Sequence, residues 1–158
     1  MILPIYLYGQ PVLRKPTENI TAESLDLPQL LSDMWETLEV AEGCGLAAPQ
    51  VGKSIRLFIV DDTELAEDYP ECQDFKKVFI NPEIIEESED TTTFSEGCLS
   101  LPGISENVIR PASITIRYMD ENFTEHTETY EGFAARIIQH EYDHLEADVF
   151  TDRISPIR

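Results

Sequence analysis

Two histidines spaced four residues apart, His140 and His144, place the strongest constraint on how this chain folds. They stand in the stretch QHEYDHL (139–145), where the pattern His-Glu-x-x-His predicts a helix that presents both imidazoles to one divalent metal ion. Glu141 follows the first histidine, so its carboxylate can act as a general base on a water molecule there. The motif is short, and taken alone it fits a surface helix with coincidental histidines about equally well.

A catalytic metal site usually takes three protein ligands, so this helix needs a partner from elsewhere in the chain. The long metzincin pattern fails, because Ala147 and Phe150 stand where that pattern requires glycine and histidine. The carboxylates that follow, Asp148 and Asp152, have no convincing helical spacing relative to the histidines. We therefore expect the third ligand upstream of the helix.

Several upstream residues are candidates for the third ligand: Cys98, Cys44, His126 and many carboxylates. Gly97 precedes Cys98, and a glycine lets the backbone approach another chain or a ligand closely. Most free cysteines are small buried hydrophobic residues, which is the simpler interpretation of Cys44 and Cys72. His126 stands in the polar stretch TEHTE and is expected to face solvent. The residues alone leave the choice open.

The rest of the chain predicts an α+β fold in a single domain, residues 1–158. A helix is expected over 25–43, where leucine, methionine and tryptophan recur at helical spacing. Apolar or alternating stretches predict strands, the last two as a hairpin, at 55–62, 78–88, 112–120 and 122–132. The stretch 78–88 is expected to form one strand or two, because Asn81-Pro82 interrupts it. We expect these mixed or antiparallel strands to pack around a buried C-terminal metal-binding helix over 133–147.

Charge and cysteine content narrow the function and the compartment. The formal net charge of −20 argues against a nucleic acid partner and against an anionic membrane surface. The three cysteines are dispersed, which fits a reducing compartment. No signal peptide is recognisable at the start and no apolar stretch is long enough to cross a bilayer, so we expect a cytoplasmic protein.

Three motifs resemble those of the peptide deformylases and follow one another in the same order. They are GCGLAAPQVG (43–52), EGCLSLPG (96–103) and QHEYDHL (139–145). The stretches between them, RPASITIRYMDE and GFAARIIQ, are also similar to that family, and the resemblance extends from about Arg14 to Ile157. It implies a hydrolase that removes the formyl group from the N-terminal formyl-methionine of newly made proteins and releases formate.

The resemblance also implies a role for each motif residue. Cys98 joins His140 and His144 as the third metal ligand, and Glu141 serves as general base and then general acid. Two hydrogen-bond donors are implied for the oxyanion of the tetrahedral intermediate: the side-chain amide of Gln50 and the backbone N–H of Leu99. Gly45 of the first motif is also implied to belong to the catalytic site. Taken alone, Gln50 reads as an ordinary loop residue.

The family implies one divalent metal per chain, with Fe²⁺ as the native ion and Zn²⁺, Ni²⁺ or Co²⁺ as substitutes, and the thiolate suits iron as well as zinc. We expect an apolar methionine pocket and a path for an extended peptide, lined by Gly43, Cys44, Gly97, Phe133 and Ile137. For Phe133 and Ile137, plain core packing is an equally good interpretation. The chain departs from the family pattern at Cys44, where isoleucine or valine is commoner, and at Ala147, where glycine is common.

Formyl-methionine nascent peptides are the expected partners of a monomeric enzyme. No basic tail follows ISPIR, so any meeting with the ribosome is expected to be transient. Two alternatives stay open: a different His-Glu-x-x-His metallohydrolase such as a peptidase, and an inactive deformylase-like module stabilised by its metal. The presence of both Glu141 and Gln50 argues against the second, because a purely structural metal site requires neither.

Overall fold

The computed structural model describes residues 2–5, 17–21, 26–41, 44–61, 75–98 and 101–146, without the side chains of 94–98 and 101–106. Its elements in chain order are α1 (Leu27–Ala41), β1 (Gly45–Ala47), the 3₁₀ helix η2 (Ala48–Val51), β2 (Leu57–Asp61), β3 (Lys76–Glu87), β4 (Thr91–Cys98), β5 (Leu101–Pro111), β6 (Ser113–Met119), β7 (Glu125–Glu131) and α2 (Gly132–Leu145).

All strand pairs are antiparallel, and they form two sheets. One sheet has five strands in the order β1-β2-β3-β6-β7, and the other is the two-stranded β4–β5 ribbon. The α+β class, the antiparallel pairing and the N-terminal helix are therefore confirmed.

Strand β2 shows how one sheet serves two cores. All four residues from Leu57 to Val60 are fully buried, because both faces of the sheet are covered. Successive side chains of a strand point to opposite faces. Leu57 and Ile59 accordingly pack in the cluster that contains α1, and Phe58 and Val60 pack in the cluster that contains α2.

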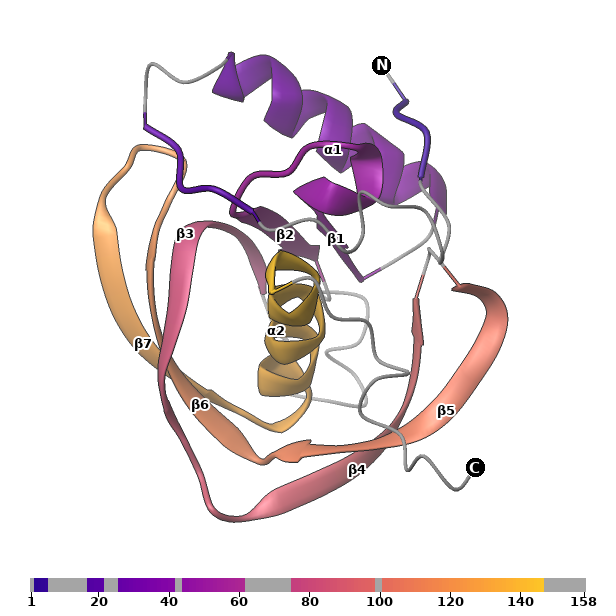
Figure 1. Cartoon of the computed structure of the whole chain (residues 1–158), viewed down its shortest axis with the longest axis vertical. Helices are drawn as coiled ribbons and strands as arrows, with labels where there is room; N and C mark the ends of the chain where they lie inside the picture. The colour runs from indigo at the N-terminus through magenta and orange to yellow at the C-terminus, as the bar shows by residue number, and fades with distance from the viewer. Residues whose placement is uncertain are drawn as a thin grey trace.

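Helix α2 lies in the middle of the molecule. In Figure 1 the strands β3, β6 and β7 curve around one side of it, the β4–β5 ribbon passes below and beside it, and α1 covers the far side of the five-stranded sheet. The expectation of a buried C-terminal helix surrounded by strands is thus confirmed, and the site it carries is enclosed by both sheets.

The expected hairpin over 112–132 is confirmed as β6 and β7, with Ser113 paired to Glu131 and Met119 to Glu125. Strand β3 was expected from 78 and runs from Lys76, continuing through Asn81-Pro82 with a shift in its pairing to β6. Asn81 takes a positive φ of 49° there, and its side chain bonds both the N–H and the C=O of Ile20. The ribbon strands were not expected from the sequence. In the part of the chain that the structure describes, no helix is long and apolar enough to span a membrane.

Candidate active site on the central helix

The histidine pair of α2 is buried and closely packed. His140 is 7% exposed and His144 is 1% exposed. Their ring centroids are 5.5 Å apart with 67° between the ring planes, as expected for side chains on adjacent turns of one helix. Both imidazoles can therefore face one small ion.

The electrostatic surroundings keep His144 neutral. Burial is the main cause that lowers the pKa of His144 to about 3, and repulsion from the Arg110 guanidinium and from any proton on His140 contributes to the same shift. A neutral imidazole keeps a lone pair on one ring nitrogen, which is the form that binds metal ions. The histidine is thus in its ligand form throughout the physiological pH range.

Glu141 lies about 100° around the helix axis from His140 and faces strand β1. It is 5% exposed, and its side chain fits against the backbone of Gly45. A β-carbon built on Gly45 would lie 2.8 Å from Cγ and from Oε2 of Glu141, closer than side chains tolerate. The glycine therefore makes the room in which this carboxylate sits.

Gln50 is held by the short helix η2, and its side chain is oriented by a backbone group. The side-chain Oε1 accepts a hydrogen bond of 2.9 Å from the N–H of Ala47. Because the group facing it is a donor, the atom there must be the oxygen, so Nε2 is the donating end of the amide. Gly52 ends η2 in the left-handed region at φ 88°, which explains the glycine that closes this motif.

The opposite flank of α2 carries polar residues that bind the β4–β5 ribbon. Arg110 of β5 forms an ion pair of 2.6 Å with Asp143, and these side chains are 0% and 4% exposed. Arg136 donates to the carbonyls of Val108 and Thr92 at 3.0 and 2.7 Å, and Gln139 donates to the carbonyl of Pro111 at 3.0 Å. None of these contacts was expected from the sequence. Their one visible signal is Arg136, a charge placed four residues before His140 on a helix face expected to be buried.

Only some of the remaining expected site residues lie within the described part of the structure. Leu99 and Gly43 lie outside the described residues, as does the side chain of Cys98, which ends β4. Among side chains that are described, no group of three His, Cys, Asp or Glu could hold a metal ion. Gly97 is paired with Ser105 in the ribbon. Cys44 is partly buried, and its backbone carbonyl accepts a bond of 2.8 Å from the N–H of Asp61.

Phe133 and Ile137 are the two expected pocket residues on the helix. Both are partly buried. Ile137 packs against the cluster of buried residues beneath α2, as the core-packing interpretation requires. These observations are compatible with a core role and with a pocket wall.

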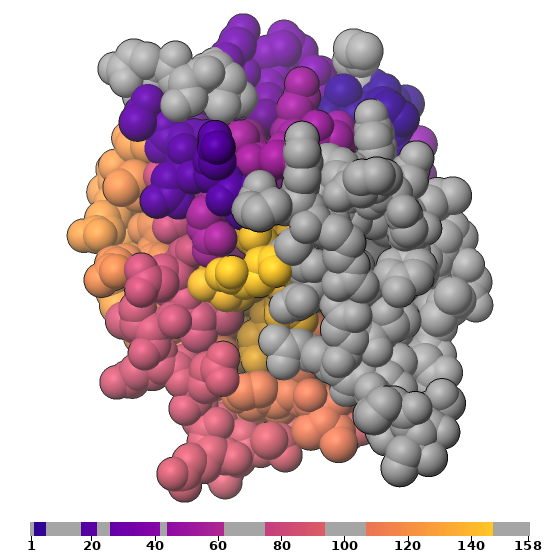
Figure 2. All heavy atoms as spheres, viewed as in Figure 1, coloured from indigo at the N-terminus to yellow at the C-terminus, as the bar shows by residue number. Residues whose placement is uncertain are grey.

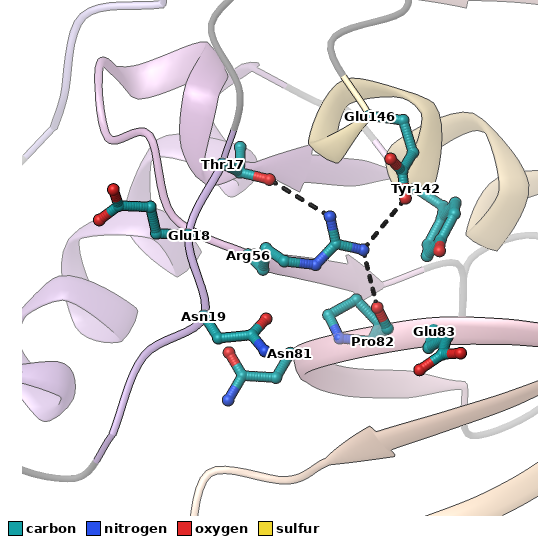
Figure 3. Close-up of a pocket in the computed structure, with 9 residues that line it drawn as sticks. All are labelled: Thr17, Glu18, Asn19, Arg56, Asn81, Pro82, Glu83, Tyr142 and Glu146. Atoms are coloured by element: carbon teal, nitrogen blue, oxygen red, sulfur yellow. Dashed lines mark hydrogen bonds and ion pairs between the residues drawn. The ribbon is translucent and has the colours of Figure 1, made fainter.

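A cavity of about 550 Å³ lies at the C-terminal end of α2. Figure 2 shows the yellow end of α2 reaching the surface there, near the violet segment 17–21 and the pink of β3. Figure 3 shows Arg56 at its centre, bonded to Thr17, to the carbonyl of Pro82 and to Glu146. These polar groups bind one another and hold the end of the helix, and neither histidine nor Glu141 lines this cavity.

Comparison with known proteins shows which family this chain belongs to. The family model for polypeptide deformylases matches residues 2–158. The chain belongs to the polypeptide deformylase family. The peptide deformylase of Christiangramia forsetii is 50% identical over 100% of this chain and 84% of its own length. That of Flavobacterium psychrophilum is 51% identical over 98% and 84%. The crystal structure of the Thermotoga maritima peptide deformylase superposes with a TM-score of 0.88 at 38% identity, covering 99% of each chain.

This deformylase is thus a hydrolase that removes the N-formyl group from formyl-methionine at the N-terminus of nascent peptides. The family is metal-dependent. These findings favour the deformylase interpretation over a different His-Glu-x-x-His hydrolase and over an inactive module.

Proposed function

We propose that Cys98, His140 and His144 hold one divalent metal ion in this deformylase, with Glu141 as the proton-transfer residue beside it. The observation that carries this proposal is the arrangement of α2. It presents two buried imidazoles on adjacent turns and a carboxylate on the flank that faces the first motif. Helix α2 packs closely against both β1 and η2, so Glu141 and Gln50 belong to one neighbourhood.

The donor set fits a divalent metal. Two neutral imidazoles and one thiolate are borderline and soft ligands, which suit Fe²⁺, Zn²⁺, Ni²⁺ or Co²⁺ better than Mg²⁺ or Ca²⁺. We propose Fe²⁺ as the native ion. When bound, such an ion polarises the formyl carbonyl and makes a water molecule nucleophilic near neutral pH.

Glu141 and the donors of the first two motifs would carry the chemistry of the protein itself. Glu141 takes a proton from the attacking water and later passes it to the leaving amine. The amide Nε2 of Gln50 and the backbone N–H of Leu99 donate to the oxyanion that forms on the formyl carbon. The bond from Ala47 N–H to Gln50 Oε1 supports this role, because it occupies the oxygen of the amide and fixes which end of the amide is the donor.

The substrate would bind as an extended strand beside β1. This strand is at one end of the five-stranded sheet, so one side of its backbone is not paired with another strand in the described part of the chain. We propose that Gly43 and Gly97 let the peptide approach, and that Cys44, Phe133 and Ile137 line the methionine pocket.

We further propose a monomeric, cytoplasmic protein with a single domain over residues 1–158. The substrate supports the compartment, because newly made chains begin there. The net charge of −20 supports a protein that meets the ribosome only in passing and does not bind its RNA.

Metal content and formate release test the ligand set together. Protein purified without oxygen and loaded with Fe²⁺ should bind one ion per chain and release formate from a formyl-Met-Ala-Ser peptide. Cys98→Ser should lose the ion and the activity, whereas Cys72→Ser, a cysteine outside all three motifs, should lose neither. Full metal content in Cys98→Ser would overturn the proposed ligand set.

A further inference from the structure

The two flanks of α2 are held in different ways. On the Glu141 flank the helix packs closely against β1 and β2. On the other flank long polar side chains span the space to the β4–β5 ribbon: Arg110 from the ribbon, Arg136 and Gln139 from the helix. The histidines occupy the stripe between these two flanks.

The contact between Arg110 and Asp143 differs from its neighbours in where it meets the helix. Arg136 and Gln139 lie before the histidine pair in the chain, whereas Asp143 lies between His140 and His144. It is about 60° around the axis from His140 and about 100° from His144. The ion pair with Arg110 therefore restrains the helical turn that carries both imidazole rings.

Arg110 is itself fixed in place. It is 1% exposed, and it lies opposite Thr92 in the ribbon, the residue whose carbonyl and hydroxyl accept bonds from Arg136. The paired ribbon residues Thr92 and Arg110 thus bind the helix twice: Arg110 binds Asp143, and Thr92 accepts bonds from Arg136. A guanidinium offers donors in a rigid planar fork, so its direction is set more narrowly than that of a lysine.

We propose that Arg110, through its buried ion pair with Asp143, is a positioning residue for the histidine pair, a role that rests on the metal site proposed above. The pair fixes the rotation of the last turns of α2 and hence the direction in which both imidazoles point. Residues that orient metal ligands typically change metal affinity by about 10- to 100-fold when they are replaced.

Co²⁺ binding to the metal-free protein tests this role without reference to catalysis. The affinity is measured by competition with a chelator, and the absorption spectrum reports the geometry around the ion and its bond to a thiolate. Arg110→Met, which keeps the length of the side chain without its charge, should bind Co²⁺ about 10- to 100-fold more weakly and with altered bands. Arg117→Met is the matched control, because it breaks an exposed arginine–carboxylate pair of 2.8 Å with Glu83, which joins strands β3 and β6 and does not involve a residue of the helix.

A double variant separates positioning from stability. Arg110→Met removes the positive charge of the buried ion pair but leaves the Asp143 carboxylate buried, and should lower the midpoint of urea unfolding. Arg110→Met together with Asp143→Leu leaves no such charge, so much of that stability should return. We expect its Co²⁺ affinity and spectrum to stay altered. A double variant that regains the wild-type midpoint, affinity and spectrum together would show that the pair is only structural, and would overturn the proposal.

Cys98→Ser keeps the two proposals distinguishable. If the wild-type thiolate band disappears in Cys98→Ser while Arg110→Met binds Co²⁺ as tightly as the wild type, only the role of Arg110 is overturned. If Cys98→Ser keeps the band and the affinity, the proposed ligand set itself is wrong and the role of Arg110 is overturned with it.

Discussion

The α-carbon of Gly45 lies so close to Glu141 that no β-carbon fits between them. The glycine has no positive φ, so alanine suits its strand backbone and the substitution adds only a methyl group. The carboxylate of Glu141 must then move, and a displacement of about 1 Å can cost about 100-fold in rate. We expect Gly45→Ala to lower kcat by about 10- to 100-fold, with KM and bound metal nearly unchanged.

Steady-state kinetics and metal analysis of the same sample check this prediction. Gly132→Ala is the control: it adds the same methyl group at a glycine with φ 66°, so it should lower stability and leave kcat nearly unchanged. Wild-type kcat in Gly45→Ala would mean that the position of Glu141 does not limit the reaction.

The amide of Gln50 performs two tasks that one substitution can separate. Gln50→Glu keeps an oxygen that accepts the bond from Ala47 N–H but removes the donating nitrogen. Loss of an oxyanion donor typically lowers kcat by about 100- to 1000-fold. We expect that loss of activity in both Gln50→Glu and Gln50→Ala, each with a lower melting temperature, because the first buries a carboxylate and the second loses the bond to Ala47. A Gln50→Glu enzyme with normal kcat would remove Gln50 from the proposed oxyanion site.

The sequence was informative about single residues only where a motif encodes chemistry directly. The spacing of His140 and His144 predicted their shared helix face, and the structure confirms that they lie side by side. The contact between Gly45 and Glu141 joins residues almost a hundred positions apart. The partnership of Arg110 with Asp143 likewise depends on how a strand passes the helix. Neither contact leaves a local pattern in the chain.

Among the elements, β3 depends on the unusual backbone of Asn81. Its positive φ of 49° suits asparagine, and its side chain holds the backbone of Ile20 at 2.8 Å on both polar groups. Asn81→Gly keeps the conformation but loses both bonds, and should cost about 1–3 kcal/mol of stability. Asn81→Ala adds the strain of the left-handed region, about 1 kcal/mol more.

Urea unfolding of the two variants measures that difference. Equal stability of Asn81→Gly and Asn81→Ala would contradict the backbone argument, because only the alanine carries the conformational strain. An Asn81→Ala variant as stable as the wild type would contradict the hydrogen bonds as well.

Helices and strands whose apolar residues recur at one regular spacing could be predicted from the sequence, and irregular elements could not. The alternation in β6 and the helical spacing of α1 each report a single buried face. The ribbon lacks such a signal: β5 contains Pro102, Gly103 and Pro111, residues typical of turns, yet it runs unbroken from Leu101 to Pro111. In β3 the pair Asn81-Pro82 marks a shift of pairing inside the strand, where sequence suggests an interruption.

At the scale of the whole molecule, the proposed metal would link two distant parts of the chain. Cys98 ends a strand of the ribbon, and the histidines belong to the central helix. A ligand that binds only the folded state at 100 times its Kd adds about 2.7 kcal/mol, which for a chain of this size raises Tm by about 5–10 °C. We expect chelation to lower Tm by that amount and added Fe²⁺ or Co²⁺ to restore it.

Differential scanning calorimetry with and without chelator measures this shift. Cys98→Ser should melt at one temperature under both conditions, whereas Arg117→Met should keep the full shift. A wild-type Tm that is indifferent to chelation would contradict a metal held jointly by the ribbon and the helix.

The arrangement of the molecule explains why its chemistry lies on α2. The five-stranded sheet separates a core formed with α1 from a core formed with α2, and the ribbon encloses the second helix from the other side. Polar groups needed for catalysis are thereby buried in a frame fixed on both flanks. The sequence predicted the helix, its motif and the β6–β7 hairpin, but the rest of the frame arises from strand pairings that no local pattern encodes.

The most direct test of the catalytic account is formate release by Glu141→Gln. The protein should be purified without oxygen, loaded with Fe²⁺ and shown to hold one ion per chain before the formyl-methionine peptide is added. We predict that the variant keeps its metal and its fold but releases formate at least about 100-fold more slowly than the wild type. Wild-type release from a metal-loaded Glu141→Gln protein would contradict the role of Glu141 in proton transfer.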